Sequence, residues 1–146
     1  MKSTVFIIAL LIMVSLPSMV QACSCRKPDV SSALEDYNKA DIVLRVKAIE
    51  FSKGWNASGP LVTFQILETY KTNQALGDTI TAKNNPLTAA CGNEINPDTE
   101  YVFGLWDLQK AGYEVKNAIG YRVMHSCAQQ GVQHYIENYY TDTKDK

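Results

Sequence analysis

The chain has 146 residues, of which 46% are hydrophobic and 20% are charged, as in one ordinary globular domain. Its 14 basic and 15 acidic side chains give a formal charge of -1 and a pI near 6.1, so the overall charge provides no electrostatic drive toward nucleic acid or anionic lipid. The two histidines, His125 and His134, show no HExxH spacing, and we therefore expect neither an enzyme nor a resident cofactor.

Residues 1–22 are predicted to be a signal peptide. Lys2 gives a short positive start, Val5–Val14 is an uncharged apolar run, and cleavage is expected after Ala22. The run is about half of the roughly 20 residues that span a bilayer, so a permanent anchor helix is the weaker interpretation. The mature chain would begin at Cys23 and be secreted and extracellular, or periplasmic in a bacterium. Lipid acylation of Cys23 is the competing interpretation, and it would block the α-amine.

All four cysteines, Cys23, Cys25, Cys91 and Cys127, lie in the predicted mature part. An exported domain of this size oxidises its cysteines, so we expect two disulfides and no free thiol. A bridge between Cys23 and Cys25 would be strained, because only one residue separates them. Each of these two should therefore reach a distant partner, and which partner each one takes stays open at this point.

Hydrophobic spacing in the first half of the mature chain predicts a short helix followed by strands. Residues 30–39 carry apolar side chains at helical spacing, and Asp29 is a suitable N-cap. Residues 41–51 alternate between apolar and polar side chains, as a half-buried strand does. Turn-rich stretches separate the further strands, which are expected at 61–70, 79–82, 101–106, 113–115 and 121–127. Five or more short strands at this spacing predict a mainly β domain with a small closed barrel.

The end of the chain predicts a second helix. Residues 128–140 place Val132 and three larger side chains on one helical face, which would pack on the barrel before the polar tail 141–146. We expect His125 to be a strand residue beside a disulfide. Trp106 and the strand tyrosines are expected in the core, whereas Trp55 falls in a predicted loop as a candidate contact residue.

Five blocks of the mature chain occur in a specific order. They are Cys23-Ser24-Cys25, ADIVLRVKA at 40–48, TFQIL at 63–67, Cys91-Gly92, and the stretch from Tyr101-Val102-Phe103-Gly104 to His125-Ser126-Cys127. In order and approximate spacing they resemble the inhibitory N-terminal domain of tissue inhibitors of metalloproteinases. The resemblance implies a netrin-like module over 23–140, built on a five-stranded OB-type barrel, with Cys23 bridged to Cys91 and Cys25 to Cys127. It is a single-domain form, with Asn38 where the family's third cysteine usually falls.

The resemblance also implies inhibition of a zinc metalloproteinase of the matrix-metalloproteinase kind. An α-amine has a pKa near 7.7 to 8.0, so its neutral fraction can donate a lone pair to the protease's zinc, together with the carbonyl oxygen of Cys23. This zinc of the target is the only metal expected. Ser24 would enter the specificity pocket. Further protease contacts are implied at Cys25, Arg26, Lys27, Pro28, Ala89, Ala90 and residues 51–60.

Other functions stay open. The first is a non-inhibitory secreted netrin-like binding or structural module, in which the disulfides are only staples. A thiol oxidoreductase would need exposed, reducible cysteines, and a zinc site of Cys23, Cys25, His125 and Cys127 would need thiols that export oxidises. Asn56 begins an N-glycosylation sequon, which is used only in a eukaryotic host. We expect a monomer with no nucleic-acid partner and no stable membrane anchor.

Overall fold

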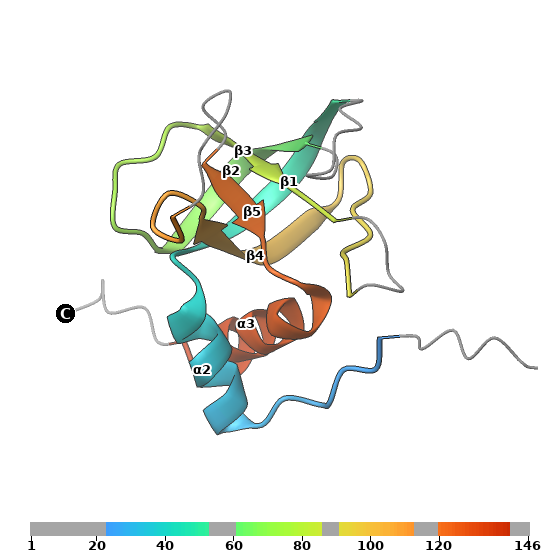
Figure 1. Cartoon of the computed structure of the whole chain (residues 1–146), viewed down its shortest axis with the longest axis vertical. Helices are drawn as coiled ribbons and strands as arrows, with labels where there is room; N and C mark the ends of the chain where they lie inside the picture. The colour runs from blue at the N-terminus through green and yellow to red at the C-terminus, as the bar shows by residue number, and fades with distance from the viewer. Residues whose placement is uncertain (1–22, 53–60, 86–90, 113–119, 141–146) are drawn as a thin grey trace, which may run out of the picture.

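The computed structural model describes residues 23–52, 61–85, 91–112 and 120–140. Five strands close a barrel in the order β1-β2-β3-β5-β4, and two helices lie together on one side of it (Figure 1). The predicted mainly β fold, a five-stranded OB-like barrel with a short helix before it and a helix after it, is confirmed. The elements are α2 (Val30–Lys39), β1 (Ile42–Ser52), β2 (Leu61–Lys71), β3 (Thr79–Lys83), β4 (Glu100–Asp107), β5 (Tyr121–Val123) and α3 (Ser126–Asn138).

The barrel closes because β1 pairs with two strands along its length. Residues 42–47 pair with β4 and residues 43–52 pair with β2, both antiparallel, and register shifts in the second pairing let β1 bend between its neighbours. β3 and β5 pair in parallel, with Lys83 opposite Arg122. Parallel strands end at the same edge of a sheet, so the segments that follow β3 and β5 leave the barrel together. Those two segments carry Cys91 and Cys127.

Helix α2 begins and ends where the sequence predicts. Asp29 is its N-cap: Asp29 Oδ1 accepts a hydrogen bond from Ser32 N at 2.8 Å, and Ser32 Oγ accepts one from Asp29 N at 3.0 Å, which completes a capping box. The other end is closed from β2, because the Lys71 ammonium donates to the last carbonyl groups, which have no partner inside the helix. The acceptors are the carbonyl oxygens of Tyr37, Asn38 and Ala40, at 3.1, 3.0 and 2.6 Å.

The prediction of a strand over 121–127 is wrong beyond Val123. α3 begins at Ser126 rather than at residue 128, and His125 is its N-cap rather than a strand residue. The reason is local: His125 has extended backbone, and its ring Nδ1 accepts a hydrogen bond from Ala128 N at 3.3 Å, as an N-cap side chain does. The other described strands lie within two residues of their predicted bounds. The strand expected at 113–115 lies outside the described residues.

Two apolar cores hold the fold. One fills the barrel, where Phe64 and Phe103 meet edge to face with ring centroids 5.6 Å apart, and Tyr101 and Tyr121 pack against it. The other lies between the barrel and the helices, and the half-buried Trp106 packs against it. Its buried members are Ala40, Val43, Met124, Ala128 and Val132.

Helix α3 is clamped to β4 by a buried amide. Gln129 Oε1 accepts a hydrogen bond from Gly104 N at 2.7 Å, and Gln129 Nε2 donates to Gly104 O at 2.8 Å. The close approach requires glycine at 104, because an added Cβ would lie 2.6 Å from Met124 Sδ and 3.2 Å from Val132 Cγ2. This clamp fixes the helix that carries Cys127 against the barrel.

Candidate functional site

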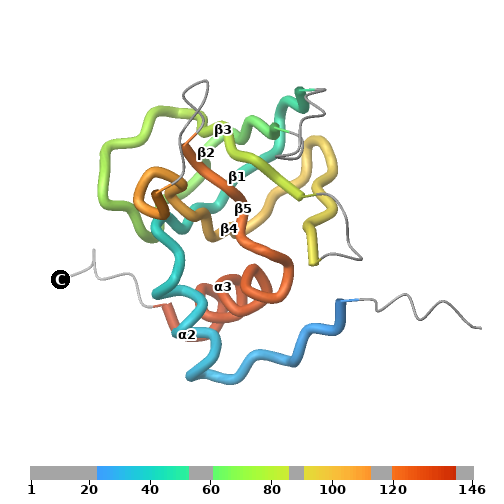
Figure 2. Tube along the Cα trace, viewed as in Figure 1, coloured from blue at the N-terminus to red at the C-terminus, as the bar shows by residue number. Residues whose placement is uncertain are grey.

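The described chain starts with an extended segment, residues 23–29, that is tied down at two points. Cys23 is bonded to Cys91 and Cys25 is bonded to Cys127, with Cα–Cα distances of 5.3 and 5.1 Å. These are the two pairs that the resemblance implies. In the chain trace the segment passes beside the start of α3 and the stretch that begins at residue 91 (Figure 2). The backbone at residue 23 is therefore held by two side chains, that of Cys23 itself and that of Cys25.

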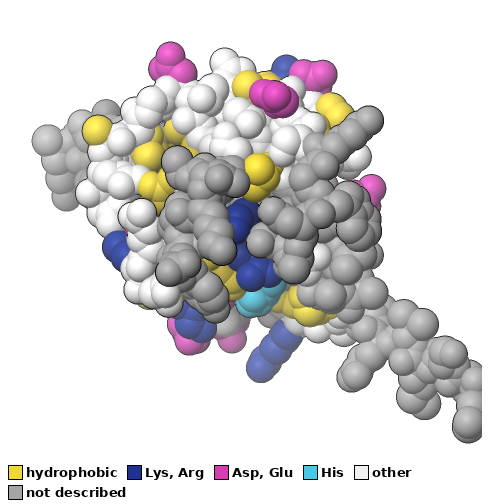
Figure 3. All heavy atoms as spheres, turned by 45° about the horizontal axis from the view of Figure 1, so that its top comes forward, with side chains coloured by type: hydrophobic (Ala, Val, Ile, Leu, Met, Phe, Trp, Pro, Cys, Tyr) yellow, Lys and Arg dark blue, Asp and Glu magenta, His cyan; other side chains and the backbone are white. Residues whose placement is uncertain are grey.

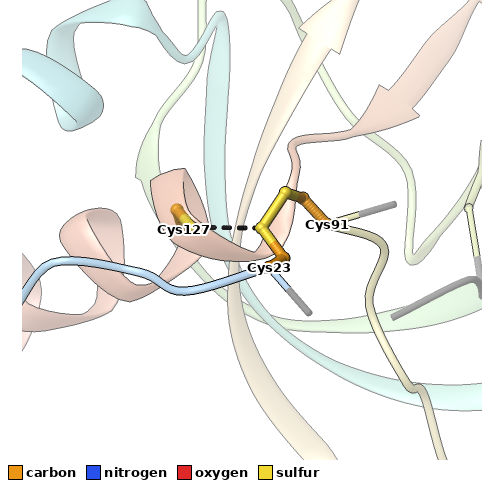
Figure 4. Close-up of side chains that lie close together, drawn as sticks. All are labelled: Cys23, Cys91 and Cys127. Atoms are coloured by element: carbon orange, nitrogen blue, oxygen red, sulfur yellow. Dashed lines mark hydrogen bonds between the residues drawn. A yellow bond between two sulfur atoms is a disulfide. The ribbon is translucent and has the colours of Figure 1, made fainter. Parts of the chain in front are cut away.

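The two anchoring cysteines, Cys91 and Cys127, lie on the segments that follow β3 and β5, and these segments contact each other. Cys127 lies in the first turn of α3, and Cys91 has a left-handed backbone with φ of +56°. The Ser126 N–H donates to the Cys91 carbonyl oxygen at 2.9 Å, which joins the two segments directly. Figure 4 shows the result: the Cys23–Cys91 bridge lies alongside the Cys127 side chain at the start of α3.

Two buried asparagines connect the Cys91 segment to the barrel. Asn84, which follows β3, donates from Nδ2 to the Asn93 carbonyl oxygen at 2.9 Å. Asn93 in turn donates from Nδ2 to the Met124 carbonyl oxygen at 2.7 Å, between β5 and α3. The sequence gives no sign of either role, because an asparagine in a turn-rich stretch is usually exposed. Both side chains are buried here, so the amides replace water as partners of the backbone.

The side chains between and after the cysteines face solvent. Ser24 is exposed between two half-buried cysteines, and Arg26 and Lys27 are exposed immediately after them. At the end of the segment the Asp29 pKa is lowered, chiefly because the Ser32 N–H donates to its carboxylate. The capping box holds the last residue of the exposed segment at the start of α2.

The sulfur atoms do not fit a resident metal in this state. The Sγ atoms of Cys23, Cys91 and Cys127 lie within 4.8 Å of one another, as thiolates around one ion would. All four cysteines are in disulfides, however, and zinc takes thiolate ligands. In the zinc site considered from the sequence, His125 is occupied as well, because its Nδ1 caps α3. The cluster is therefore a pair of adjacent disulfides.

Lys83 and Arg122 form a small basic strip on the barrel surface near these segments, although the overall charge of the chain is close to zero. Figure 3 shows Lys and Arg side chains gathered near the middle of one face, with a histidine beside them and acidic side chains toward its edges. Lys83 and Arg122 are neighbours across the parallel pair β3 and β5, and neither forms an ion pair within the described part of the chain. The strands they lie on lead into the Cys91 and Cys127 segments. Cross-strand register, which the sequence alone does not specify, brings the two cations together.

Several sequence-based predictions lie outside the described residues. They concern the signal peptide over 1–22, the loop contacts at 53–60 with Trp55 and Asn56, the contacts at Ala89 and Ala90, and the tail 141–146. The described part of the implied contact set is Cys23, Ser24, Cys25, Arg26, Lys27, Pro28, Phe51 and Ser52.

Comparisons with known proteins leave the family open. No family model matches the chain, and no curated protein matches it. Among the described helices, none is both long and apolar enough to cross a membrane. The two disulfides indicate an oxidising, extracellular type of environment.

Proposed function

We propose that this protein, after removal of residues 1–22, is a secreted inhibitor of zinc metalloproteinases. In this proposal the α-amine nitrogen and the carbonyl oxygen of Cys23 both bind the catalytic zinc of the target and occupy the position of its reactive water. The observation that carries the proposal is the double anchoring of the chain start: Cys23 is bonded to Cys91, and Cys25 to Cys127. As an inhibitor the protein acts as a stoichiometric ligand and catalyses no reaction of the protease's substrate.

The disulfide of Cys23 determines which donors the residue can offer to a metal. Its sulfur is committed to Cys91, so residue 23 can present only backbone atoms to an approaching zinc. At physiological pH a useful fraction of an α-amine with an ordinary pKa near 8 is neutral and carries a free lone pair. A nitrogen and an oxygen donor from one residue close a small chelate ring, which suits the borderline character of zinc.

Anchoring also reduces the cost of binding. A free chain end loses conformational entropy when a partner orders it, and this loss is subtracted from the binding energy. Here the two bridges order residues 23–25 when the chain folds, before any protease is met. More of the metal–ligand energy is then available as affinity.

The surroundings of Cys23 fit contact with a protein cleft. Ser24 is exposed between the two bridges, where its side chain can enter a pocket beside the zinc. Arg26 and Lys27 are exposed after it, and Lys83 and Arg122 lie on strands that lead into the anchoring segments. These cations favour a target whose active-site cleft has an acidic rim, because complementary charge raises the association rate.

Selective blocking of one nitrogen tests the proposal. The secreted protein is characterised by intact mass and N-terminal sequencing, then carbamylated near neutral pH, where an α-amine with a pKa near 8 reacts ahead of lysines near 10.4. Inhibition of a panel of zinc metalloproteinases should be lost while thermal unfolding is unchanged, and peptide mapping controls for modified lysines. A processed, fully bridged, unblocked protein that inhibits no member of the panel would favour the non-inhibitory binding or structural module.

A further inference from the structure

The two disulfides touch each other. Cys23 Sγ lies 3.8 Å from Cys127 Sγ, although each is bonded to a different partner (Figure 4). Cys23, Cys91 and Cys127 form the group of sulfurs that all lie within 4.8 Å of one another. Cys25 does not belong to this group, so its sulfur lies on the far side of the Cys25–Cys127 bridge. The arrangement is therefore asymmetric: one end of the second bridge faces the first bridge, and the other end does not.

We propose that this cluster is a thiol–disulfide exchange site whose substrates are external thiols. In the first step, the thiolate of an external thiol attacks Cys25 Sγ, a mixed disulfide forms on Cys25, and the Cys25–Cys127 bond breaks to release the Cys127 thiolate. In the second step, the Cys127 thiolate attacks Cys23 Sγ. A Cys23–Cys127 bond forms, the Cys23–Cys91 bond breaks, and Cys91 leaves as a thiolate that takes a proton from water. Each step breaks one S–S bond and forms one, so no further oxidant or reductant is needed.

The surroundings give access for the first step and proximity for the second. The first step needs access to Cys25, which is half-buried between the exposed side chains of Ser24 and Arg26. The second step needs Cys127 to stay beside the first bridge after its own bond has opened. Cys127 is held there by the first turn of α3, whose Ser126 N–H bonds the Cys91 carbonyl oxygen at 2.9 Å. Because helix and turn keep their positions, the attacking sulfur remains close to its target. Cys127 Sγ also lies within 4.8 Å of Cys91 Sγ, so in the bridged state it is not in line with the Cys23–Cys91 bond, and the freed Cys127 side chain has to turn about its Cα–Cβ bond before it attacks Cys23 Sγ.

Exchange would change how residue 23 is held. Cys23 would pass from the turn at Cys91 to the helix at Cys127, and Cys25 would lose its intramolecular anchor. If the proposed function holds, external thiols would then weaken inhibition, because the amine and carbonyl of Cys23 no longer have their prepared position. This consequence rests on the proposed function, whereas the exchange itself does not.

Two matched single variants test the exchange by disulfide mapping, without any protease. Cys25→Ser leaves Cys127 as an unpaired thiol beside an intact Cys23–Cys91 bridge, and Cys127→Ser leaves Cys25 unpaired on the far side. Both are incubated at pH 8, quenched in acid, alkylated with N-ethylmaleimide and mapped without reduction. We expect at least about tenfold more alkylated Cys91 in Cys25→Ser than in Cys127→Ser, together with a Cys23–Cys127 peptide. Equal alkylation of Cys91 in the two variants would overturn the proposal.

A wild-type arm keeps the proposal testable if either variant fails to fold. The native protein is exposed briefly to glutathione and quenched in the same way. The expected intermediate carries glutathione on Cys25, a Cys23–Cys127 bond and alkylated Cys91. If the trapped species instead retains Cys23–Cys91 and carries alkylated Cys127, the second step does not occur.

Discussion

The buried amide of Gln129 should contribute more to stability than any exposed residue of its helix. Gln129 is 6% exposed and bonds both backbone groups of Gly104, which is itself buried. The Gly104 carbonyl oxygen also accepts a hydrogen bond from Met124 N at 3.1 Å, whereas the Gly104 N–H donates to Gln129 Oε1. Replacing Gln129 with Leu keeps a similar volume and leaves that N–H buried without a partner. The unpaired donor costs about 1–3 kcal/mol and the second lost bond about 1 kcal/mol, so we expect a loss of about 2–4 kcal/mol.

Urea denaturation measures this loss. The midpoint should fall while the slope stays constant, because the surface exposed on unfolding hardly changes. Gln130→Leu, on the exposed face one residue along α3, is the matched control and should change the free energy of unfolding by no more than about 0.5 kcal/mol. If Gln129→Leu and Gln130→Leu were equally stable, the amide would not be the clamp that holds α3 to β4.

Three further predictions follow from individual contacts. Gly131→Ala should cost about 1–3 kcal/mol in denaturant melts, because the new Cβ would lie 2.9 Å from Asp36 Cβ. The control Gly77→Ala should be nearly neutral, because a Cβ there meets no atom of the described residues within 4 Å. Equal stability of the two variants would reject the close packing of α2 on α3. Burial, and then the hydrogen bond to Glu68, raises the pKa of Tyr70 to about 12. Since this folded-state pKa exceeds the unfolded value near 10, the stability it contributes is complete below about pH 10 and is lost as the pH rises through about 12. Denaturation at a series of alkaline pH values should show a shallower decline for Tyr70→Phe than for the wild type, and parallel declines would contradict the shift. Ser24→Gly should weaken inhibition, because it removes a side chain that contacts the specificity pocket. Larger apolar residues at position 24 should strengthen inhibition of some proteases and weaken that of others. If the inhibition constants of all these variants were the same, residue 24 would not be the one that enters the pocket.

The sequence predicts those parts of the fold that depend on local signals. Helix α2 is found at its predicted bounds because its apolar spacing and the Asp29 cap both act within a few residues. The end of β5 is predicted wrongly because His125 is rarely expected as an N-cap, and only the three-dimensional turn shows that its ring accepts from Ala128 N. Gln129 and Asn93 could not be recognised, since their partners are backbone atoms 25 and 31 residues away in sequence.

In the candidate site, too, the sequence predicts the features that depend on local chemistry and misses those that depend on distant contacts. Composition and the cysteine count predict two disulfides from local chemistry, but spacing alone leaves the partners of Cys23 and Cys25 open. The parallel alignment of β3 with β5 brings the segments that carry Cys91 and Cys127 together, and which of the two bonds Cys23 depends on how residues 23–25 lie against them. The contact between the two bridges and the Lys83–Arg122 strip also depend on this alignment, so neither could be found from the sequence.

The most direct test of the proposed function is the inhibition constant of a protein with one extra alanine before Cys23. The addition moves the free amine by one residue and turns the Cys23 nitrogen into an amide, which is a poor zinc ligand, while both bridges and both cores stay as they are. We predict that inhibition weakens by more than about 100-fold, equivalent to about 2.8 kcal/mol, while the free energy of unfolding changes by less than about 1 kcal/mol. Equal inhibition by the extended and the correctly processed protein would contradict zinc ligation by Cys23.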